Sequence, residues 1–186
     1  MGPNKPELIS GVAFLDRDGV LIENVNRHGV EGSARNLSEI KIKENIDLLI
    51  SALRLRNIIS IVVTNQPDIA RGILDQSSIK LMHEYLCKKL GISMIVWCPH
   101  DDKDNCTCRK PKNGMITFAL KKLKIETSVA QILIGDRKSD IDCARQSNIP
   151  AYHLSLDDKC ECTAIQHIVS IEDKVISSIL EKFEFK

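Results

Sequence analysis

The chain has 186 residues, of which 43% are hydrophobic and 27% charged, and its formal net charge is +1. This length suits one domain with a sizeable core, and the balanced charge argues against a nucleic-acid-binding or membrane-surface protein, since both usually carry a basic excess. No apolar run approaches the ~18 residues of a membrane span, and the N-terminus lacks the apolar core of a secretory signal. We expect a cytoplasmic, monomeric protein whose single domain covers residues 1–186, with its core at about 8–156.

Strand and helix patterns alternate along the chain. The predicted strands are Val12–Leu15, Ile58–Val63, Ser93–Cys98, Ile132–Ile134 and Ala151–Leu154. The predicted helices are Asn45–Arg56, Asp75–Leu90, Met115–Leu123, Ser139–Asn148 and Val175–Phe183. Asp75 should cap its helix, Gly91 should end it, and His83 should lie on its surface. The alternation indicates an α/β fold, a mostly parallel Rossmann-like sheet flanked by helices. The short segments between strands leave no room for a large cap domain, so the loops 21–37 and 99–113 should roof the site.

Polar side chains follow several predicted strands, and parallel sheets bind ligands beyond the carboxyl ends of their strands. Asp16, Asp18 and Asp136 supply carboxylates there, which need a cation in order to coexist, and hard oxygen ligands suit Mg²⁺. The neighbouring polar and cationic residues suit phosphate oxygens; they are Thr64, Asn65, Gln66, Arg109, Lys110 and Arg137. The residues therefore predict Mg²⁺-assisted phosphoryl transfer.

Asp16 and Asp18 suit a division of roles, in which one carboxylate attacks phosphorus and the other acts as general acid and base. Gly19 would let the chain turn sharply enough for both to approach one centre. Asp140 is compatible either with a supporting role at the site or with an ordinary polar helix position. Neither the glycine-rich phosphate-binding motifs nor the serine-hydrolase elbow GxSxG occurs in the chain.

The chain has 7 cysteines, and an odd number without a secretory signal favours metal binding or burial over a disulfide framework. A short loop, 98–108, carries ligands that would fill a tetrahedral Zn²⁺ shell and form a closed structural site; they are Cys98, His100, Cys106 and Cys108. The metal would order this loop and aim Arg109 and Lys110, which follow it directly.

The other cysteines show no comparable pattern. Cys87 and Cys143 occupy helical positions typical of small core residues. Cys160 and Cys162 have only loosely spaced histidine neighbours, so we assign them no role.

Together these segments resemble the haloacid-dehalogenase superfamily. The matching motifs are FLDRDGV, VVTNQ, the lysine of CRKP, and IGDRKSD, which run in order between Val12 and Leu154. The resemblance implies that Asp16 is the nucleophile and Asp18 the acid/base. It implies that Thr64, Asn65 and Gln66 contact the phosphoryl group, Lys110 neutralises it and Arg109 contacts the substrate. It also implies Mg²⁺ bound by Asp16, Asp136 and the backbone carbonyl of Asp18.

A narrower resemblance rests on TNQPDIARG, CPH…CTCRKP and KNGM. These segments are similar to the phosphatases that remove the 7-phosphate of D-glycero-D-manno-heptose 1,7-bisphosphate in ADP- or GDP-heptose biosynthesis for lipopolysaccharide or surface glycans. A small sugar phosphate would then be the only partner. Arg137 stands where that group usually has lysine, and Arg27 and His28 match its substrate loop.

Three alternatives remain open. The short spacing between His100 and Cys106 is more like that of histidinol-phosphate phosphatases. A nucleic-acid-end phosphatase and a non-catalytic zinc-binding scaffold are the other two.

Overall fold

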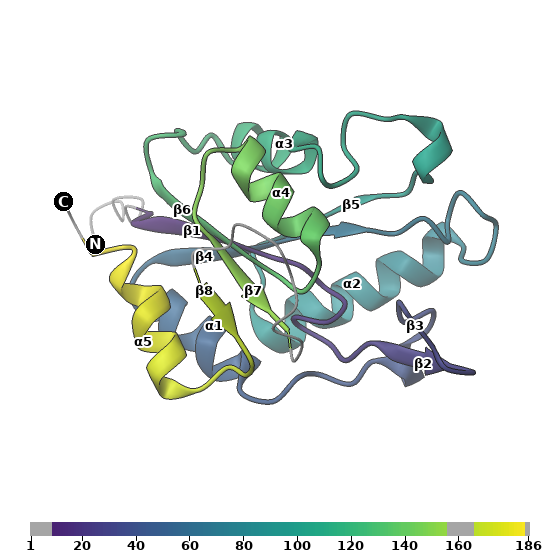
Figure 1. The fold of residues 1–186 in the computed structure, drawn as a ribbon, viewed down its shortest axis with the longest axis horizontal. Helices are drawn as coiled ribbons and strands as arrows, with labels where there is room; N and C mark the ends of the chain where they lie inside the picture. The colour runs from purple at the N-terminus through teal and green to yellow at the C-terminus, as the bar shows by residue number, and fades with distance from the viewer. Residues whose placement is uncertain (1–8, 156–165, 185–186) are drawn as a thin grey trace, which may run out of the picture.

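The structure, a computed structural model, describes residues 9–155 and 166–184. Its main sheet has 6 strands in the order β5-β4-β1-β6-β7-β8, and every neighbouring pair is parallel (Figure 1). The strands are β1 (Gly11–Leu15), β4 (Ile58–Asn65), β5 (Met94–Cys98), β6 (Ala130–Gly135), β7 (Ala151–Leu154) and β8 (Gln166–Ile168). The parallel sheet predicted from the alternation is confirmed.

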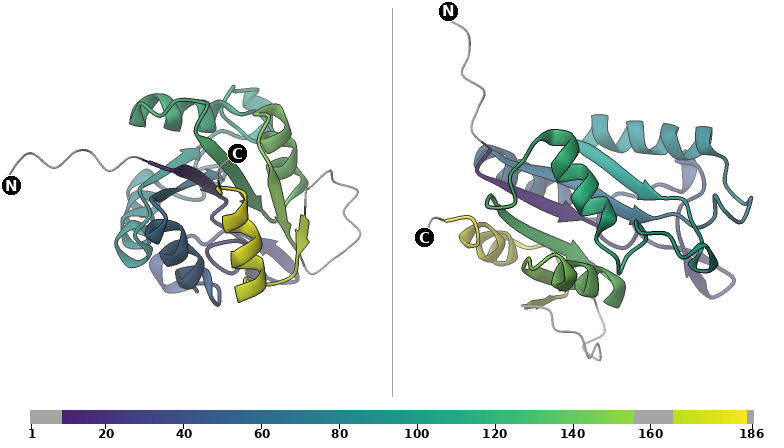
Figure 2. Two further views of the ribbon diagram at one scale, coloured as in Figure 1. Left: turned by 90° about the vertical axis from the view of Figure 1, so that its left-hand side faces the viewer. Right: turned by 90° about the horizontal axis from the view of Figure 1, so that it is seen from above.

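Helices cover both faces of this sheet. They are α1 (Ile46–Leu55), α2 (Gln76–Leu90), α3 (Gly114–Leu123), α4 (Lys138–Gln146) and α5 (Asp173–Glu181). In Figure 1, α3 and α4 lie above the sheet, and α1, α2 and α5 lie below it; Figure 2 shows the same three layers from two other sides. Asp75 caps α2 by accepting from the Ser78 N–H, and Gly91 ends it at a positive φ of 74°, as predicted.

The central strand β1 contacts the helices on both faces of the sheet. All its residues are buried, and successive side chains point to opposite faces. Ala13 and Leu15 pack in the core beneath α1, α2 and α5, whereas Val12 and Phe14 pack under α3 and α4. The apolar run in the sequence is therefore a strand buried on both sides, which is typical of parallel sheets.

The order of the strands determines where the site lies. From β1 the chain passes to β4 and β5 on one side, then returns to β6, β7 and β8 on the other. The direction of winding thus reverses at β1, and ligands bind beyond the carboxyl ends of the strands at such a reversal. Asp16 follows the central strand, and Asp136 follows its neighbour β6.

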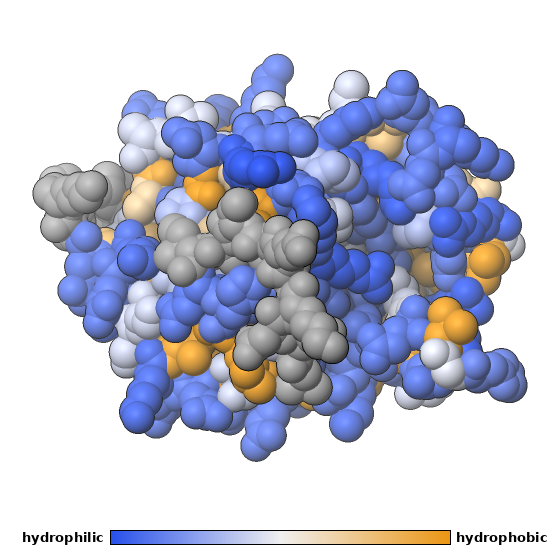
Figure 3. Space-filling model, viewed as in Figure 1, coloured by the Kyte–Doolittle hydropathy of each residue, from blue (hydrophilic) through white to orange (hydrophobic). Residues whose placement is uncertain are grey.

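Several short elements were not predicted. A hairpin of β2 (Val25–Arg27) and β3 (Val30–Gly32) lies between β1 and α1, and β8 extends the sheet at its edge. Short 3₁₀ turns occur at Leu37–Glu39 and Asp102–Asp104. In the described parts of the chain, no helix has both the length and the apolarity needed to cross a bilayer. The face shown in Figure 3 is mostly hydrophilic, with apolar residues in small separate groups.

Candidate active site

Asp16 lies at the centre of the polar residues gathered at the strand ends. It is buried, and its Oδ1 lies 2.7 Å from the Arg17 backbone nitrogen, which donates to it, and 3.0 Å from Lys110 Nζ. Burial raises the pKa of Asp16 to about 7, with the nearby carboxylates adding to the rise and Lys110 opposing it. Both contacts fall on Oδ1, which leaves Oδ2 as the freer oxygen.

Lys110 is a buried cation held on several sides. Its ammonium donates to the Val63 backbone oxygen at 2.7 Å and forms ion pairs with Asp16 and Asp140. Although burial acts in the opposite direction, these two carboxylates raise the pKa of Lys110, so it stays protonated. Asn65 fixes the backbone of Lys110, because its amide accepts from the Lys110 N–H and donates to the Lys110 oxygen, both at 3.0 Å.

Three carboxylates, those of Asp16, Asp136 and Asp140, offer oxygens that all lie within 4.8 Å of one another. Lys110 neutralises two of them, whereas Oδ1 of Asp136 is buried and finds no hydrogen-bond partner among the residues that the structure describes. Burial and the Asp140 charge raise the pKa of Asp136. This surplus of oxygen ligands beside the predicted nucleophile fits a hard divalent cation such as Mg²⁺. The cluster includes Asp140, whose role the sequence left open, and not the carboxylate of Asp18.

Gly19 makes this arrangement possible. Its φ is +83°, and a Cβ at this position would lie 2.0 Å from Asp136 Oδ2. The sharp turn predicted after the aspartates is therefore present, and it brings the backbone directly against a carboxylate of the cluster.

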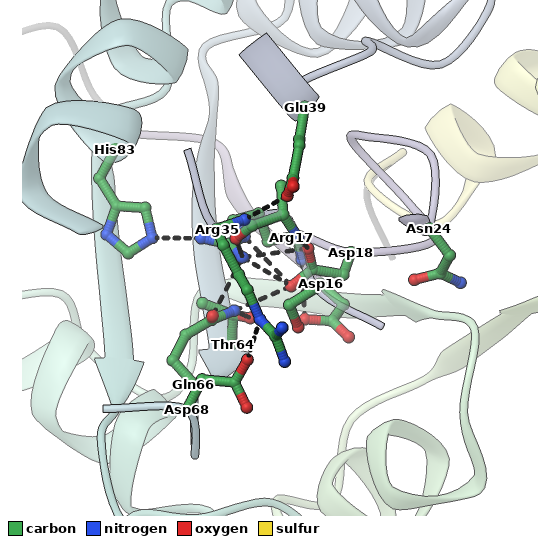
Figure 4. A network of polar contacts seen from close by, with 12 residues as sticks. Asp16, Arg17, Asp18, Asn24, Arg35, Glu39, Thr64, Gln66, Asp68 and His83 are labelled. Atoms are coloured by element: carbon green, nitrogen blue, oxygen red, sulfur yellow. Dashed lines mark hydrogen bonds and ion pairs between the residues drawn. The ribbon is translucent and has the colours of Figure 1, made fainter. Parts of the chain in front are cut away.

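Asp18 belongs to a separate, buried network (Figure 4). Arg17 donates to both of its oxygens, from Nε at 3.1 Å and from Nη2 at 3.0 Å. Gln66 Nε2 donates at 2.8 Å and the Ala34 N–H at 3.3 Å. Burial alone would raise the pKa of Asp18, but the Arg17 charge and these hydrogen bonds lower it. Asp18 is thus held as a carboxylate.

Two neighbours of Asp18 bear on the sequence predictions. Both N–H groups of the Gln66 amide are used, on Asp18 and on Thr64 Oγ1, and the phosphate contact of Gln66 stays a prediction. His83 is 4% exposed and not on the helix surface, and its Nε2 lies 3.2 Å from Arg17 Nη1. Thr64 is buried beside Gln66, with its hydroxyl hydrogen left for another acceptor.

The cysteine- and histidine-rich loop folds into a compact cluster. The Sγ atoms of Cys98, Cys106 and Cys108 lie 3.3–3.6 Å apart, and His100 Nδ1 lies 3.5 Å from Cys98 Sγ and 3.3 Å from Cys108 Sγ. Burial acts against ionisation of Cys106, but the Arg109 N–H and neighbouring thiols lower its pKa to about 6. The predicted ligands are therefore gathered around one point and can hold a metal ion.

The remaining predicted substrate residues contact groups outside the carboxylate cluster or are exposed. Arg109 donates to Asp102 Oδ1 at 2.6 Å and to the His100 oxygen at 3.3 Å, and Arg137 is largely exposed. Arg27 pairs with Glu39 inside its own loop, and His28 is exposed at the hairpin turn. Among the described residues, neither Arg27 nor His28 contacts the carboxylate cluster, so their substrate role stays a prediction.

A pair of histidines contacts the backbone of Asp136. His153 Nε2 lies 3.0 Å from the Asp136 backbone oxygen and therefore donates to it, and His153 Nδ1 lies 3.1 Å from His167 Nδ1. The sequence did not suggest this contact.

Cys160 and Cys162 lie outside the described residues; Cys143 is buried as predicted, and Cys87 is half-buried.

A pocket of about 670 Å³ opens beside Gly19 and Asp136. Its polar lining includes Asn24, Glu31 and Lys43. This volume falls within the roughly 300–1,000 Å³ typical of small-molecule sites. The pocket therefore offers room for a substrate next to the carboxylate cluster.

Comparison with known proteins places these features in a family. The profile of the polynucleotide kinase 3 phosphatase family matches residues 11–153. The D-glycero-alpha-D-manno-heptose-1,7-bisphosphate 7-phosphatase of Photorhabdus laumondii is 33% identical over 156 residues, covering 77% of this chain and 81% of that protein. The D-glycero-beta-D-manno-heptose-1,7-bisphosphate 7-phosphatase of Haemophilus influenzae is 31% identical over 139 residues, covering 69% and 72%.

The fold has close structural counterparts. The crystal structure of D,D-heptose 1,7-bisphosphate phosphatase from B. bronchiseptica, complexed with magnesium and phosphate, superposes with a TM-score of 0.76 at 21% identity. It covers 92% of this chain and 98% of its own. The chain therefore belongs to the polynucleotide kinase 3 phosphatase family of haloacid-dehalogenase-like phosphatases, and is a phosphoric monoester hydrolase.

Proposed function

We propose that the protein is a Mg²⁺-dependent phosphomonoesterase that acts through an aspartyl-phosphate on Asp16. The observation that carries this proposal is the placement of buried Asp16 beside both Lys110 and an Asp136 oxygen that has no hydrogen-bond partner among the described residues. Bound Mg²⁺ would neutralise phosphoryl oxygens and lower the barrier to attack by an anionic nucleophile. Asp16, Asp136 and the Asp18 backbone carbonyl would hold it, and Asp140 would hold Lys110 in place.

In the first half-reaction, Asp16 forms a bond to phosphorus while the bond from phosphorus to the leaving oxygen breaks. Asp18 gives that oxygen its proton, and Lys110 and Thr64 contact the transferring phosphoryl oxygens. In the second half-reaction, Asp18 takes a proton from water, the water oxygen bonds to phosphorus, and Asp16 is released together with inorganic phosphate. Asp18 is held as a carboxylate in the free protein, which suits the second step.

The substrate we propose is D-glycero-D-manno-heptose 1,7-bisphosphate, from which the 7-phosphate is removed. The relatives named for this reaction support the proposal, as does a polar pocket whose carboxylates, such as Glu31, would accept hydrogen bonds from sugar hydroxyls. Arg109, which precedes Lys110 in the chain, would contact the second phosphate.

Phosphate release from a substrate panel tests the proposal. The panel contains both anomers of heptose 1,7-bisphosphate, histidinol phosphate and a 3′-phosphorylated oligonucleotide. We expect the heptose bisphosphates to have the highest kcat/KM, and Asp16→Asn to abolish turnover. The matched control is Asp142→Asn, which should leave the rate unchanged. Asp142 is an aspartate of α4 that pairs with Lys138 and Arg145 at the surface. A faster reaction with histidinol phosphate or the oligonucleotide would reassign the substrate, and an active Asp16→Asn variant would refute the mechanism.

We further propose that the cysteine and histidine cluster holds one structural Zn²⁺. With Zn–S bonds of ~2.3 Å, the sulfurs of a tetrahedral site lie ~3.8 Å apart, which is close to the observed separations of 3.3–3.6 Å. The ion would order the loop 98–108, which directly precedes Arg109 and Lys110. Elemental analysis should find one zinc per chain, and a zinc-free protein with full activity would refute this role.

A further inference from the structure

Arg17 lies between the two aspartates in sequence, yet its side chain is completely buried. Figure 4 shows its guanidinium between Asp18 and the ring of His83, which reaches in from α2. Beside its two bonds to Asp18, Arg17 Nη2 donates to Gln66 Oε1 at 3.0 Å. Its Nη1 lies 3.2 Å from His83 Nε2. The ring of His83 in turn packs edge-on against Trp97, with centroids 5.1 Å apart.

The chemistry of these groups fixes their roles. A guanidinium has only donors, so His83 Nε2 must accept, and the imidazole is neutral with its hydrogen on Nδ1. Burial and the Arg17 charge lower the pKa of His83 to about 3, in agreement with a neutral ring. His83 therefore supplies a hydrogen-bond acceptor to a buried cation whose other face is bound to Asp18.

This acceptor limits how the guanidinium can rotate. The planar fork of arginine binds a carboxylate through two parallel hydrogen bonds only in one orientation. Asp18 and Gln66 engage the Nε and Nη2 side, and His83 engages Nη1 on the opposite side. Without His83, a buried Nη1 donor would lose its partner, and a different orientation of Arg17 would become favourable.

We propose that His83 is a positioning residue that acts through Arg17 to aim the Asp18 carboxyl group at the leaving oxygen. The inference rests on the proposed function, because it concerns the proton that Asp18 gives to that oxygen. His83 itself does not touch the substrate. Its contribution is to keep Arg17, and through it Asp18, in a single orientation.

The dependence on the leaving group provides a test. A sugar alkoxide must be protonated as it departs, whereas p-nitrophenolate is a stable anion and leaves without a proton. We compare kcat/KM, which reports phosphoryl transfer to Asp16, for heptose 1,7-bisphosphate and p-nitrophenyl phosphate in wild type, His83→Phe and His83→Gln. Glutamine retains an acceptor near the position of Nε2, and phenylalanine has none.

We expect His83→Phe to lower kcat/KM for the sugar phosphate by at least about tenfold, since positioned proton transfer contributes roughly 10²–10⁴-fold. The fall should appear in kcat more than in KM, and p-nitrophenyl phosphate should lose less than about twofold. His83→Gln should recover most of the lost activity. Met82→Leu, a volume-conserving change at the buried neighbour on α2, is the matched control and should leave both substrates unaffected.

Each other outcome is decisive. Equal losses for both esters, or no recovery with His83→Gln, would show a merely structural role and overturn the proposal. An unchanged His83→Phe variant would overturn it as well. If the phenylalanine variant does not fold, as judged by its unfolding transition, His83→Leu takes its place. A wild-type protein that hydrolyses neither ester would overturn the proposed function, and this inference with it.

Discussion

Replacing Lys110 by methionine removes the only cation that contacts Asp16 and Asp140 among the described residues. At the 3.0 Å separation from Asp16, Coulomb attraction at an effective dielectric constant of ~20 amounts to about 5–6 kcal/mol. The variant also avoids the cost of burying the lysine, so we expect a net loss of about 3–5 kcal/mol in unfolding free energy, as for other broken buried pairs. Asp16 and Asp140, both buried, would lose the cation that they contact, next to the partly buried Asp136.

This loss should depend on pH in a defined direction. Lys110 holds down the raised pKa values of Asp16 and Asp136, so without it both lie further above their unfolded values and the folded protein binds more protons than the unfolded chain. Stability then falls as pH rises from about 4 towards and beyond 7, and the destabilisation should be smaller at pH 5 than at pH 8. Urea unfolding at both pH values, in EDTA, measures the difference.

The matched control is Lys138→Met, which breaks an exposed ion pair with Asp142 and should cost less than about 1 kcal/mol. The double variant Lys110→Met/Asp140→Asn should recover part of the loss, because one repelling carboxylate is neutralised. A loss below about 1 kcal/mol in Lys110→Met, or an equal loss at pH 5 and pH 8, would refute this account of the charge cluster.

Three further predictions concern other parts of the site. The pKa of His83 is about 3 in the folded protein against 6.5 in the unfolded chain. The unfolding free energy therefore decreases as pH falls from 6.5 to 3, because the unfolded chain binds the proton more tightly. Relative to His83→Gln, the unfolding free energy of the wild type should therefore fall more steeply with decreasing pH, by up to about 1.4 kcal/mol per pH unit. Gly19→Ala should cost about 1–2 kcal/mol from its positive φ alone and should abolish phosphatase activity, because the new Cβ displaces Asp136; full activity would contradict that reading. Cys108→Ser should lose the loop metal and lower kcat through disorder at Lys110, as measured by metal content and phosphate release, and retention of one zinc per chain would argue against the assigned ligands.

The sequence predicted the framework of the site because strand patterns and strand ends are local features. The apolar run before Asp16 and the one before Asp136 were recognised as strands, and the rule for parallel sheets placed their ends together. The strand β8 and the hairpin of β2 and β3 were missed, since each has only 3 residues and lacks an apolar run. Their pairing depends on the sheet edge and on the loop, which no local pattern encodes.

The misplacement of His83 has a different cause. His83 follows Ile79 by one helical turn and precedes Leu86 by another, so its spacing puts it on the buried face of α2. Spacing alone does not decide the burial of a histidine, because a buried imidazole requires a partner that the sequence does not reveal. That partner, Arg17, is 66 residues away in the chain.

The same limit applies to the two amides at the end of β4. Their position near the predicted phosphate site follows from the strand end, but their hydrogen-bond partners do not. Asn65 holds the backbone of Lys110 and Gln66 holds Asp18, so both fix the orientation of other groups. Likewise, the ion pair of Asp140 with Lys110 depends on the position of α4 in the fold, which the sequence pattern does not reveal.

Asp16 and Asp18, separated by one residue, have opposite electrostatic surroundings. Burial raises the pKa of Asp16 to about 7, and Arg17 lowers that of Asp18. In the proposed mechanism the nucleophile must be ionised and the general acid protonated, and in the free protein burial opposes the first state while Arg17 opposes the second. A divalent cation held by Asp16 and Asp136 would lower the pKa of Asp16, and a dianionic phosphate ester would raise that of Asp18. The proposed mechanism therefore favours the reactive combination of protonation states when the cation and the ester are both bound.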